Sequence, residues 1–229
     1  NFSVINSLPY ISTHPVDKEI TQGSSSSLYV SVYRASGVTY QWYQGNAGDL
    51  SNPIDNSISS SLSRSSSDLG IGEHRYWVRI SNSTGHVDSK AGQITVHPAS
   101  FEQWATAYDL TLLLNTGDKS SSGDQIPDLM KYAMGLDPRV HYEGPILEYD
   151  TSGSGAGNYF TVQFNLRREL NDVDVWVEES VDMLTWTPST VNVGPTLDNG
   201  DGTSAFIYRA SQPMNTEPRF IRLRVEPKL

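Results

Sequence analysis

The sequence predicts a mainly β protein in which two β-sandwich domains are joined by a short two-helix linker. Apolar and polar residues alternate with a period of two in many short segments. Gly, Asn, Asp and Ser separate these segments, as expected for short strands joined by turns. Apolar residues at helical spacing occur mainly within residues 99–143. We therefore expect an N-terminal arm at 1–12, a first sandwich at 13–98, the linker at 99–143 and a second sandwich at 144–229.

The N-terminal arm is apolar. Phe2 and Val4 alternate as in a strand, Ile5 follows, and Pro9 interrupts the run. The arm is either the first strand of the first domain or a strand donated to a neighbouring subunit, where it would satisfy backbone groups at an open sheet edge. In the second case Phe2, Val4 and Ile5 are the expected subunit-contact residues.

The first domain has the pattern of a small antiparallel sandwich. Its strongest expected strands are 28–32, 38–43, 73–80 and 91–96. Residues 57–67 form a serine-rich connection in which Ile58 and Leu62 are expected to face inward. A turn is expected at 82–85.

Three motifs of this domain are similar to those of a known family. Tyr40-Gln41-Trp42-Tyr43, Asp68-Leu69-Gly70 and Tyr76-Trp77-Val78 resemble the immunoglobulin-like domains of exported bacterial proteins, over about 13–97. The resemblance implies that Trp42 is buried between the sheets and that Tyr76 makes the tyrosine corner. It also implies that Val78 stands where many relatives have the second cysteine.

The linker contains two helical patterns. Phe101, Trp104, Ala105 and Tyr108 predict a helix over 100–110, and Ser100 with Gln103 fits a capping box. Leu129, Met130, Ala133 and Leu136 predict a second helix of about three turns. Pro127 suits its first turn, Asp124 or Gln125 lies near its expected N-cap, and Gly135 with Pro138 ends it.

Residues 101–138 resemble a linker with half of an EF-hand, found near the C-termini of many secreted bacterial proteins. Ser120, Ser122, Asp124 and Asp128 fall at the first, third, fifth and ninth positions of a calcium loop. Gln125 replaces the loop glycine, and Lys131 replaces the bidentate glutamate. Since an ammonium group repels a metal ion, we expect a degenerate structural loop without a cofactor. Calcium is the alternative, with Asp118, Asp124 and Asp128 as the remnant ligands.

The second domain has four clearly alternating segments. They are 158–166, 173–180, 205–209 and 219–225. Turns are expected at 152–157 and 198–202. Together with the linker, the domain resembles the C-terminal β-domain of the same secreted proteins, and the resemblance covers 101–229. Members of that family share a location and an architecture but no single activity.

Charge and composition exclude several classes of partner. The formal net charge of −10 argues against nucleic acid and against an anionic membrane. The longest apolar runs are too short to span a bilayer, so no membrane insertion is expected. The chain has no cysteine, which excludes a disulfide framework and a thiolate metal site. A start at Asn1 is compatible with a mature chain whose signal peptide has been removed, and we expect a secreted or cell-surface protein.

No set of catalytic residues stands out. The five histidines are scattered, and no nucleophile elbow or His-Glu-x-x-His motif is present. Glu178 or Glu179 could supply one carboxylate of a glycosidase pair, but adjacent strand residues point to opposite faces and the sequence identifies no partner carboxylate. Asn82-Ser83-Thr84 is a glycosylation sequon on an expected turn. We expect a protein that is not an enzyme.

Aromatic residues suggest binding. The chain has 12 tyrosines and five tryptophans, and Tyr29, Tyr33, Tyr43 and Trp77 fall on the outward phase of their strands. The first hypothesis is an extracellular structural protein that assembles with copies of itself into a fibre or surface layer through strand or edge contacts. The alternative is a carbohydrate-binding or adhesive accessory module of a larger secreted protein, with a surface polysaccharide as the partner.

Overall fold

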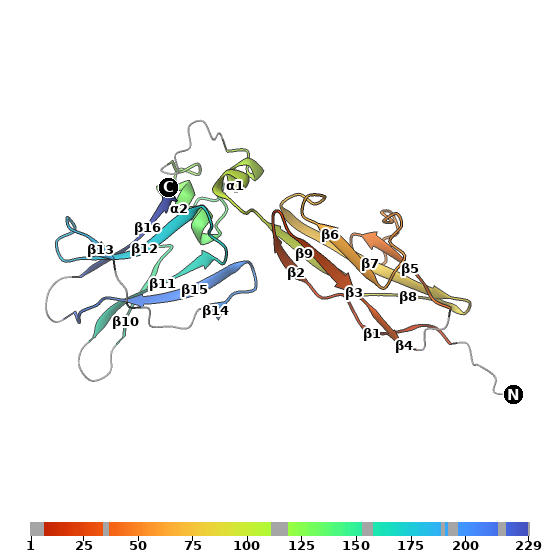
Figure 1. Ribbon diagram of the computed structural model, residues 1–229. Coiled ribbons are helices and arrows are strands. Elements are labelled where there is room, and N and C mark those ends of the chain that lie inside the picture. The colour runs from red at the N-terminus through yellow and green to blue at the C-terminus, as the bar shows by residue number, and fades with distance from the viewer. Residues whose placement is uncertain are drawn as a thin grey trace. The chain divides into compact units, whose positions relative to one another are not determined.

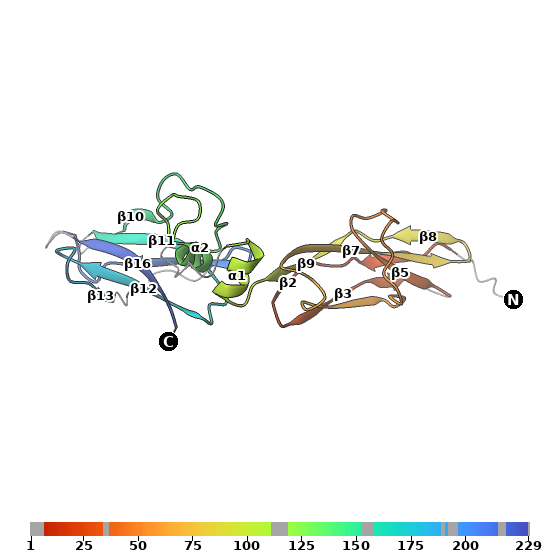
Figure 2. The same ribbon diagram turned by 90° about the horizontal axis from the view of Figure 1, so that it is seen from above.

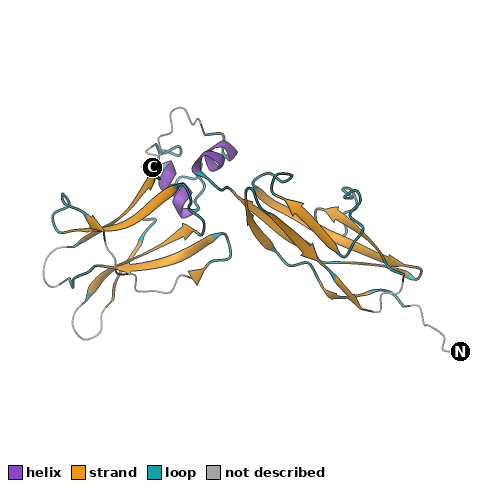
Figure 3. Ribbon diagram, viewed as in Figure 1, coloured by secondary structure: helices purple, strands orange, loops and turns teal. Residues whose placement is uncertain are grey.

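The computed structural model divides into two compact units, Asn1–Pro98 and Ala99–Leu229. It describes residues 7–33, 37–110, 119–152, 158–188, 191, 197–214 and 219–228. Each unit consists mainly of β-strands, and two short helices belong to the second unit (Figures 1 and 3). The predicted fold class, two β-sandwiches and a short helical segment, is confirmed.

The first unit contains nine strands among its described residues. They are β1 (Tyr10–Thr13), β2 (Lys18–Thr21), β3 (Ser25–Tyr29), β4 (Ser31–Tyr33), β5 (Thr39–Gln44), β6 (Ser61–Ser65), β7 (Gly72–Asn82), β8 (Gly85–Asp88) and β9 (Gly92–His97). One sheet has the order β2-β9-β7-β5, with β8 also paired to β7. Opposite it, β1 pairs with β4 and β3 pairs with β6. Only Val30 separates β3 from β4, so these two act as one long strand that changes partner.

The core of the first unit lies between the two layers. Trp42 of β5 is fully buried and stands opposite Val78 of β7. Its indole Nε1 donates a hydrogen bond to the Ser59 carbonyl at 2.9 Å. Leu28 and Leu62 from the opposite layer complete the same cluster. The sandwich is immunoglobulin-like, because the buried tryptophan packs between the two layers.

The serine-rich connection differs from its prediction. Leu62 is buried as expected, but Ile58 is exposed. Residues 61–65 form the strand β6, in register with β3 from Ser25↔Ser65 to Tyr29↔Ser61. Serine has little intrinsic preference for strands, so pairing with β3 determines this conformation.

The second unit begins with two helices. Helix α1 (Phe101–Ala107) starts at Ser100, whose hydroxyl accepts a hydrogen bond from the Gln103 amide, as predicted. Gln103 in turn accepts from the Ala99 amide at 2.8 Å. Helix α2 (Asp128–Met134) starts later than predicted, with Pro127 at its N-cap and no side-chain cap, so it has about two turns. Gly135 ends α2 in the left-handed conformation, with φ of 73°, as its position predicted.

Two sheets follow the helices. The strands are β10 (Glu148–Ser152), β11 (Tyr159–Arg167), β12 (Val173–Ser180), β13 (Thr187–Pro188), β14 (Leu197–Asp198), β15 (Thr203–Arg209) and β16 (Phe220–Pro227). The described strands form a sheet of order β10-β11-β15-β14 and a sheet of order β13-β12-β16, all antiparallel. The four predicted segments correspond to β11, β12, β15 and β16. Val162 and Phe164 of one sheet meet Val177 and Leu223 of the other in a common core.

Both helices pack onto the strands of the second unit. Ala133 and Met134 of α2 belong to the core between its sheets, and α2 lies beside β11 and β16 in both views (Figures 1 and 2). An aromatic cluster attaches α1 to α2: Trp104 lies with its ring centroid 5.7 Å from that of Tyr132. The Tyr132 hydroxyl donates to Asp172 Oδ1 at 2.9 Å, and the Phe101 amide donates to Oδ2 of the same carboxylate at 2.5 Å.

Candidate functional site

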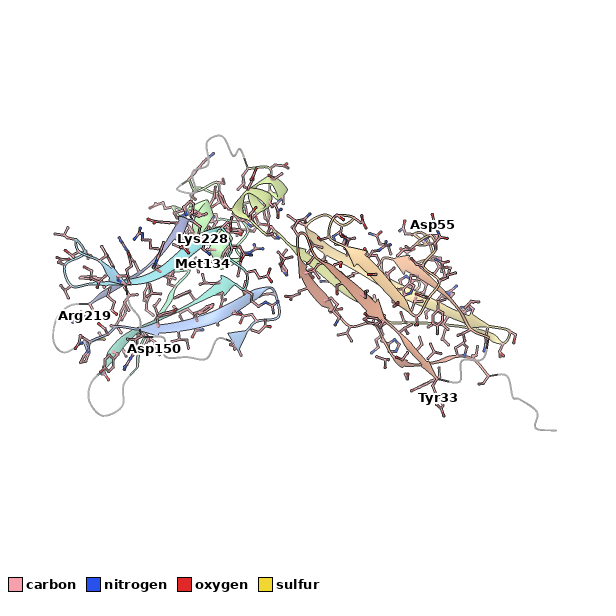
Figure 4. All side chains as sticks on the ribbon, viewed as in Figure 1. Tyr33, Asp55, Met134, Asp150, Arg219 and Lys228 are labelled. Atoms are coloured by element: carbon pink, nitrogen blue, oxygen red, sulfur yellow. The ribbon has the colours of Figure 1, made fainter. Side chains whose placement is uncertain are left out.

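One sheet face of the first unit carries an unusual set of side chains. From Leu28 to Tyr33 the residues of β3 and β4 alternate between the core and the surface: Leu28 and Val30 are buried, whereas Tyr29 and Tyr33 are exposed. Tyr10 of β1 stands directly opposite Tyr33 in the antiparallel register. The exposed fractions are 65% for Tyr10, 60% for Tyr29 and 62% for Tyr33. In Figure 4, Tyr33 projects away from the ribbon on the β1–β4 side of the unit.

The rest of this face is hydroxylic. By the alternation of the four strands, with a register shift between Ile11 and Thr13 of β1, its outward members are all Tyr, Ser or Thr. They are Tyr10, Ser12, Thr13, Ser25, Ser27, Tyr29, Ser31, Tyr33, Ser61, Ser63 and Ser65. We call this set the tyrosine–serine face. Arg64 is the one charged residue in β1, β3, β4 and β6, all described in full, and its guanidinium turns inward, 5.4 Å from the Tyr76 ring centroid.

Serine side chains also close the open edge of β6. Ser60 and Ser66, which flank β6, form backbone hydrogen bonds with Val30 and Ser24, which flank β3. By the antiparallel pattern, the odd-numbered residues of β6 therefore direct their backbone groups to the open edge. There the Ser59 hydroxyl donates to the Ser61 carbonyl at 2.7 Å and accepts from the Ser61 amide at 3.3 Å. The Ser65 hydroxyl accepts from the Ser67 amide at 3.3 Å. Local hydrogen bonds therefore replace part of a neighbouring strand.

The edge of β5 is covered by the chain that follows it. The Trp42 amide donates to the Ser57 carbonyl at 3.1 Å, and the Ile54 amide donates to the Trp42 carbonyl at 2.9 Å. Pro53, which has no N–H group, forms an isolated bridge with Tyr43. A proline at such a place prevents further strand pairing.

Two of the four aromatics predicted to face outward are confirmed. Tyr29 and Tyr33 are exposed, but Trp77 is fully buried, so its prediction was wrong. The Tyr43 ring stacks on the Trp77 ring with their centroids 4.6 Å apart, and Arg79 lies 5.7 Å from the Trp77 ring. Strand phase places Trp77 on the outer face, but neighbouring side chains cover it there. Tyr10 was missed because Pro9 obscured the short alternating run after it.

The predicted loop before α2 encloses the Lys131 ammonium. Lys131 Nζ lies 2.6 Å from Asp124 Oδ2, and both side chains are fully buried. The ammonium also donates to Ser122 Oγ at 2.5 Å and to the Val140 carbonyl at 3.1 Å. Asp124 accepts three further hydrogen bonds, from Ser120 Oγ, the Ile126 amide and the Tyr142 amide. These oxygens are of the kind that binds calcium, and here they surround a lysine.

The hydrogen bonds around Asp124, including the one from Lys131, lower the pKa of its carboxyl group. Burial alone raises the pKa of Asp124, but the hydrogen bonds from Lys131, Ser120 and the two amides together outweigh it. The pKa of Asp124 is therefore held far below its usual range.

The other two possible calcium ligands named from the sequence are Asp128 and Asp118. Asp128 is buried in the first turn of α2 and accepts from the Ser121 amide at 2.9 Å and the Ser121 hydroxyl at 2.6 Å. Asp118 lies outside the described residues. Among the residues that the structure describes, no group of three or more His, Cys, Asp or Glu is arranged to hold a metal ion.

The expected subunit-contact residues Phe2, Val4 and Ile5 also lie outside the described residues. The described part of the arm contacts its own unit. The Asn82 side-chain amide donates to the Ser7 carbonyl at 2.7 Å. Leu8 lies against Gly85: a Cβ atom at Gly85 would come within 2.8 Å of Leu8 Cδ2. The amide nitrogen of the Asn82 sequon is thus already used in a hydrogen bond.

Glu178 and Glu179 point to opposite faces of β12, as predicted. Glu178 forms ion pairs with Arg222 at 2.7 Å and Arg224 at 3.1 Å. Glu179 accepts hydrogen bonds from the Ser211 amide at 2.9 Å and the Ser211 hydroxyl at 3.0 Å. Each carboxylate has its own structural partners.

Comparisons with known proteins give structural similarity only. No protein-family model and no curated protein matches the chain. Among solved structures, the titin M10–obscurin-like 1 Ig complex is 17% identical, with a TM-score of 0.31, over 39% of this chain and 94% of that chain. The tandem Ig repeats of Dlar are 18% identical, with a TM-score of 0.31, over 39% of this chain and 48% of that chain. Three titin Ig domains, I67–I69, are 8% identical, with a TM-score of 0.34, over 96% of this chain and 64% of that chain.

These neighbours are described as Ig domains. Their similarity is too low to transfer a function, so function has to be argued from the chain itself. In the described part of the chain, no helix is both long and apolar enough to cross a membrane.

Proposed function

We propose that the chain is a non-enzymatic adhesive module that binds polysaccharide through the tyrosine–serine face of its first unit. The observation that supports this function is the composition of that face. It carries three largely exposed tyrosines among serines and threonines, with no outward charged residue in its four described strands.

The chemistry of sugars suits such a surface. A pyranose ring has an apolar face of C–H groups, which stacks on an aromatic ring, and a rim of hydroxyl groups, which exchange hydrogen bonds with serine. Tyrosine loses little side-chain entropy on binding because it has only two rotatable bonds. Tyr10 and Tyr33 lie side by side on paired strands, so together they offer a broader stacking surface than one ring.

A secreted or cell-surface location agrees with this function. The resemblance of residues 101–229 to the linker and C-terminal β-domain of exported bacterial proteins is the support for it. In this proposal the second unit acts as the structural part of the protein, and the Lys131 ion pair stabilises its linker loop without a metal. In this proposal Glu178 and Glu179 are structural residues, each with its own partners.

Affinity electrophoresis of the full chain tests the proposal. The gels contain hydroxyethyl cellulose, xylan, galactomannan, laminarin or dextran. We expect retardation on at least one polymer, and Tyr29→Ala and Tyr33→Ala should each weaken it roughly fivefold to tenfold, since one stacking contact contributes about 1 kcal/mol. Tyr149→Ala is the matched control, because Tyr149 is an exposed tyrosine of the second unit. Unchanged mobility on all polymers, or equal loss in the control, refutes the proposal.

Self-association through the N-terminal arm is the second candidate. An apolar arm whose first residues are Asn1-Phe2-Ser3-Val4-Ile5 supports it. In the first unit the edges of β5 and β6 are covered by local hydrogen bonds, and the outer edge of β1 is one of the remaining edges that could accept a donated strand.

Deleting residues 1–6, which leaves the Ser7 and Leu8 contacts intact, tests this candidate. Light scattering and negative-stain microscopy should show filaments or oligomers for the full chain and monomers for the truncated chain. Monomers in both cases, or filaments in both cases, exclude the arm as the assembly element.

A further inference from the structure

We propose that the ligand of the tyrosine–serine face is an extended, uncharged polysaccharide that lies along the β3–β4 direction and contacts several sugar residues at once. This inference depends on the proposed function and specifies its substrate class. It follows from three properties of the face: its lack of charge, its length and its arrangement of hydroxyl groups.

The absence of charge selects against acidic glycans. Binding of a carboxylated or sulfated sugar normally uses Arg or Lys, which pair with the anionic group. In β1, β3, β4 and β6 the one cationic side chain, Arg64, turns to the interior beside Tyr76. The chain as a whole carries a formal charge of −10, which repels an anionic polymer. A neutral glycan meets no such penalty.

The length of the face selects for a polymer. Tyr29 and Tyr33 are four residues apart on nearly continuous strands, so about 13 Å separates them. That distance is longer than one pyranose ring. From Ser25 to Tyr33 the outward residues extend over about 26 Å. A ligand that contacts both tyrosines therefore needs several linked sugars in an extended conformation.

Two hydroxyl groups of the tyrosine–serine face are already oriented by hydrogen bonds. The Ser27 hydroxyl donates to the Ser63 hydroxyl at 3.1 Å, and the Ser12 hydroxyl donates to the Ser31 carbonyl at 3.2 Å. Each hydroxyl oxygen retains acceptor capacity for a sugar hydroxyl. Because Ser27 is held by Ser63 and Ser12 by the Ser31 carbonyl, binding orders few additional side chains at these places. Neutral donors and acceptors in a row match a repeating neutral polymer.

A protein partner is the competing class, because surfaces rich in Tyr and Ser also recognise proteins. The uncharged row of hydroxyls along the strands favours the glycan: protein interfaces usually have a charged or polar rim and aromatic or Arg anchors at their centre. The test treats a protein partner as an alternative outcome.

The first experiment uses matched neutral and anionic polymers. Affinity gels compare hydroxyethyl cellulose with carboxymethyl cellulose and dextran with dextran sulfate, using the full chain, Tyr10→Ala, Tyr33→Ala and the Tyr149→Ala control. We expect retardation by a neutral member that is at least severalfold stronger than by its anionic counterpart and that depends on Tyr10 and Tyr33. Equal or stronger tyrosine-dependent retardation by the anionic member overturns this inference while leaving the proposed function intact.

The second experiment measures ligand length. Calorimetry with oligosaccharides of graded length, prepared from the neutral polymer that binds, should show affinity rising at least tenfold from the disaccharide to the hexasaccharide. Substituting Tyr29 by Ala should remove most of this gain, whereas Tyr29→Phe should keep it. A disaccharide that binds as tightly as the hexasaccharide overturns the extended ligand. Binding of no polysaccharide at all overturns both proposals and leaves a protein partner as the remaining class.

Discussion

Replacing Lys131 by methionine is the sharpest test of the internal structure of the second unit. The side chain keeps a similar length and its apolar stem, but the ammonium group is lost. In the native protein that ammonium contacts Asp124, Ser122 and the Val140 carbonyl, with Asp124 and Lys131 fully buried. The substitution therefore leaves a buried carboxylate without its counter-ion.

The expected cost follows from that geometry. Removing one partner of a buried ion pair destabilises a protein by about 3–5 kcal/mol. Asp124 keeps hydrogen bonds from Ser120 Oγ and from the Ile126 and Tyr142 amides. We therefore expect the lower end of the range, about 3 kcal/mol. For a unit of this size, that corresponds to roughly 10 °C in the midpoint of thermal unfolding.

The loss should depend on pH in a definite direction. The folded pKa of Asp124 is depressed, so this carboxylate stabilises the native protein above the unfolded pKa of about 3.9, and the stabilisation is lost as the pH falls below that value. Without Lys131 the folded pKa rises, because burial is then opposed by fewer hydrogen bonds. In acid, protonation of Asp124 removes the buried unpaired charge and so reduces the loss of stability in the Lys131→Met variant. The difference in unfolding free energy between the native protein and Lys131→Met should shrink from pH 7 to pH 3.5.

Hydrogen exchange with mass spectrometry, together with urea unfolding of the full chain, measures both effects. Peptides from 119–142 should lose protection, whereas peptides from β7 in the first unit should not. Lys119→Met is the matched control, because Lys119 is an exposed lysine of the same loop and should change stability by less than about 0.5 kcal/mol. A loss below about 1 kcal/mol at pH 7, or a loss that does not change with pH, refutes the reasoning.

Three further predictions concern the same two units. Calcium chloride at millimolar concentration, compared with EDTA, should leave the unfolding midpoint of the full chain unchanged, because the Lys131 ammonium lies among the loop oxygens. A calcium-dependent rise of the midpoint, measured by calorimetry, would contradict this. Gly135→Ala should cost about 2 kcal/mol in urea unfolding, since φ is +73° and the new Cβ would lie 2.6 Å from Thr203 Cγ2; an Ala variant as stable as the native chain would show that α2 can end differently. Trp42→Ala should lower the free energy of unfolding of the first unit by about 3–5 kcal/mol and leave the Ser59 carbonyl without its indole donor. Leu184→Ala, at an exposed position, should change it very little, and thermal unfolding measures both.

Local sequence patterns were sufficient for much of the fold. Alternation of apolar and polar residues identified the strands around Trp42, and the same pattern identified β11, β12, β15 and β16. Ser100 marked the start of α1 and Gly135 the end of α2, because caps depend on residues a few positions apart. Such features are local, so one segment contains the information.

Strand β6 and the start of α2 could not be predicted in the same way. The serines of β6 have weak strand preference, and their pairing with β3 depends on a segment about 36 residues away, as in the bond from Ser27 to Ser63. The side chain of Asp124 suggested a helix cap, but in the folded loop it binds Lys131 instead. The local preference is outweighed by a distant strand in the first case and by a lysine seven residues along the chain in the second.

For the candidate site, too, the sequence determines some features and the tertiary structure determines others. Sequence phase alone determined that Tyr29 and Tyr33 face away from the core, because a strand directs alternate residues to opposite faces. Tertiary structure decided that Tyr10 stands beside Tyr33 and that Trp77, on an equally outward phase, is covered by Tyr43. Phase follows from backbone geometry within one strand. Exposure depends on which side chains neighbouring strands bring to that place, and only the folded chain determines them.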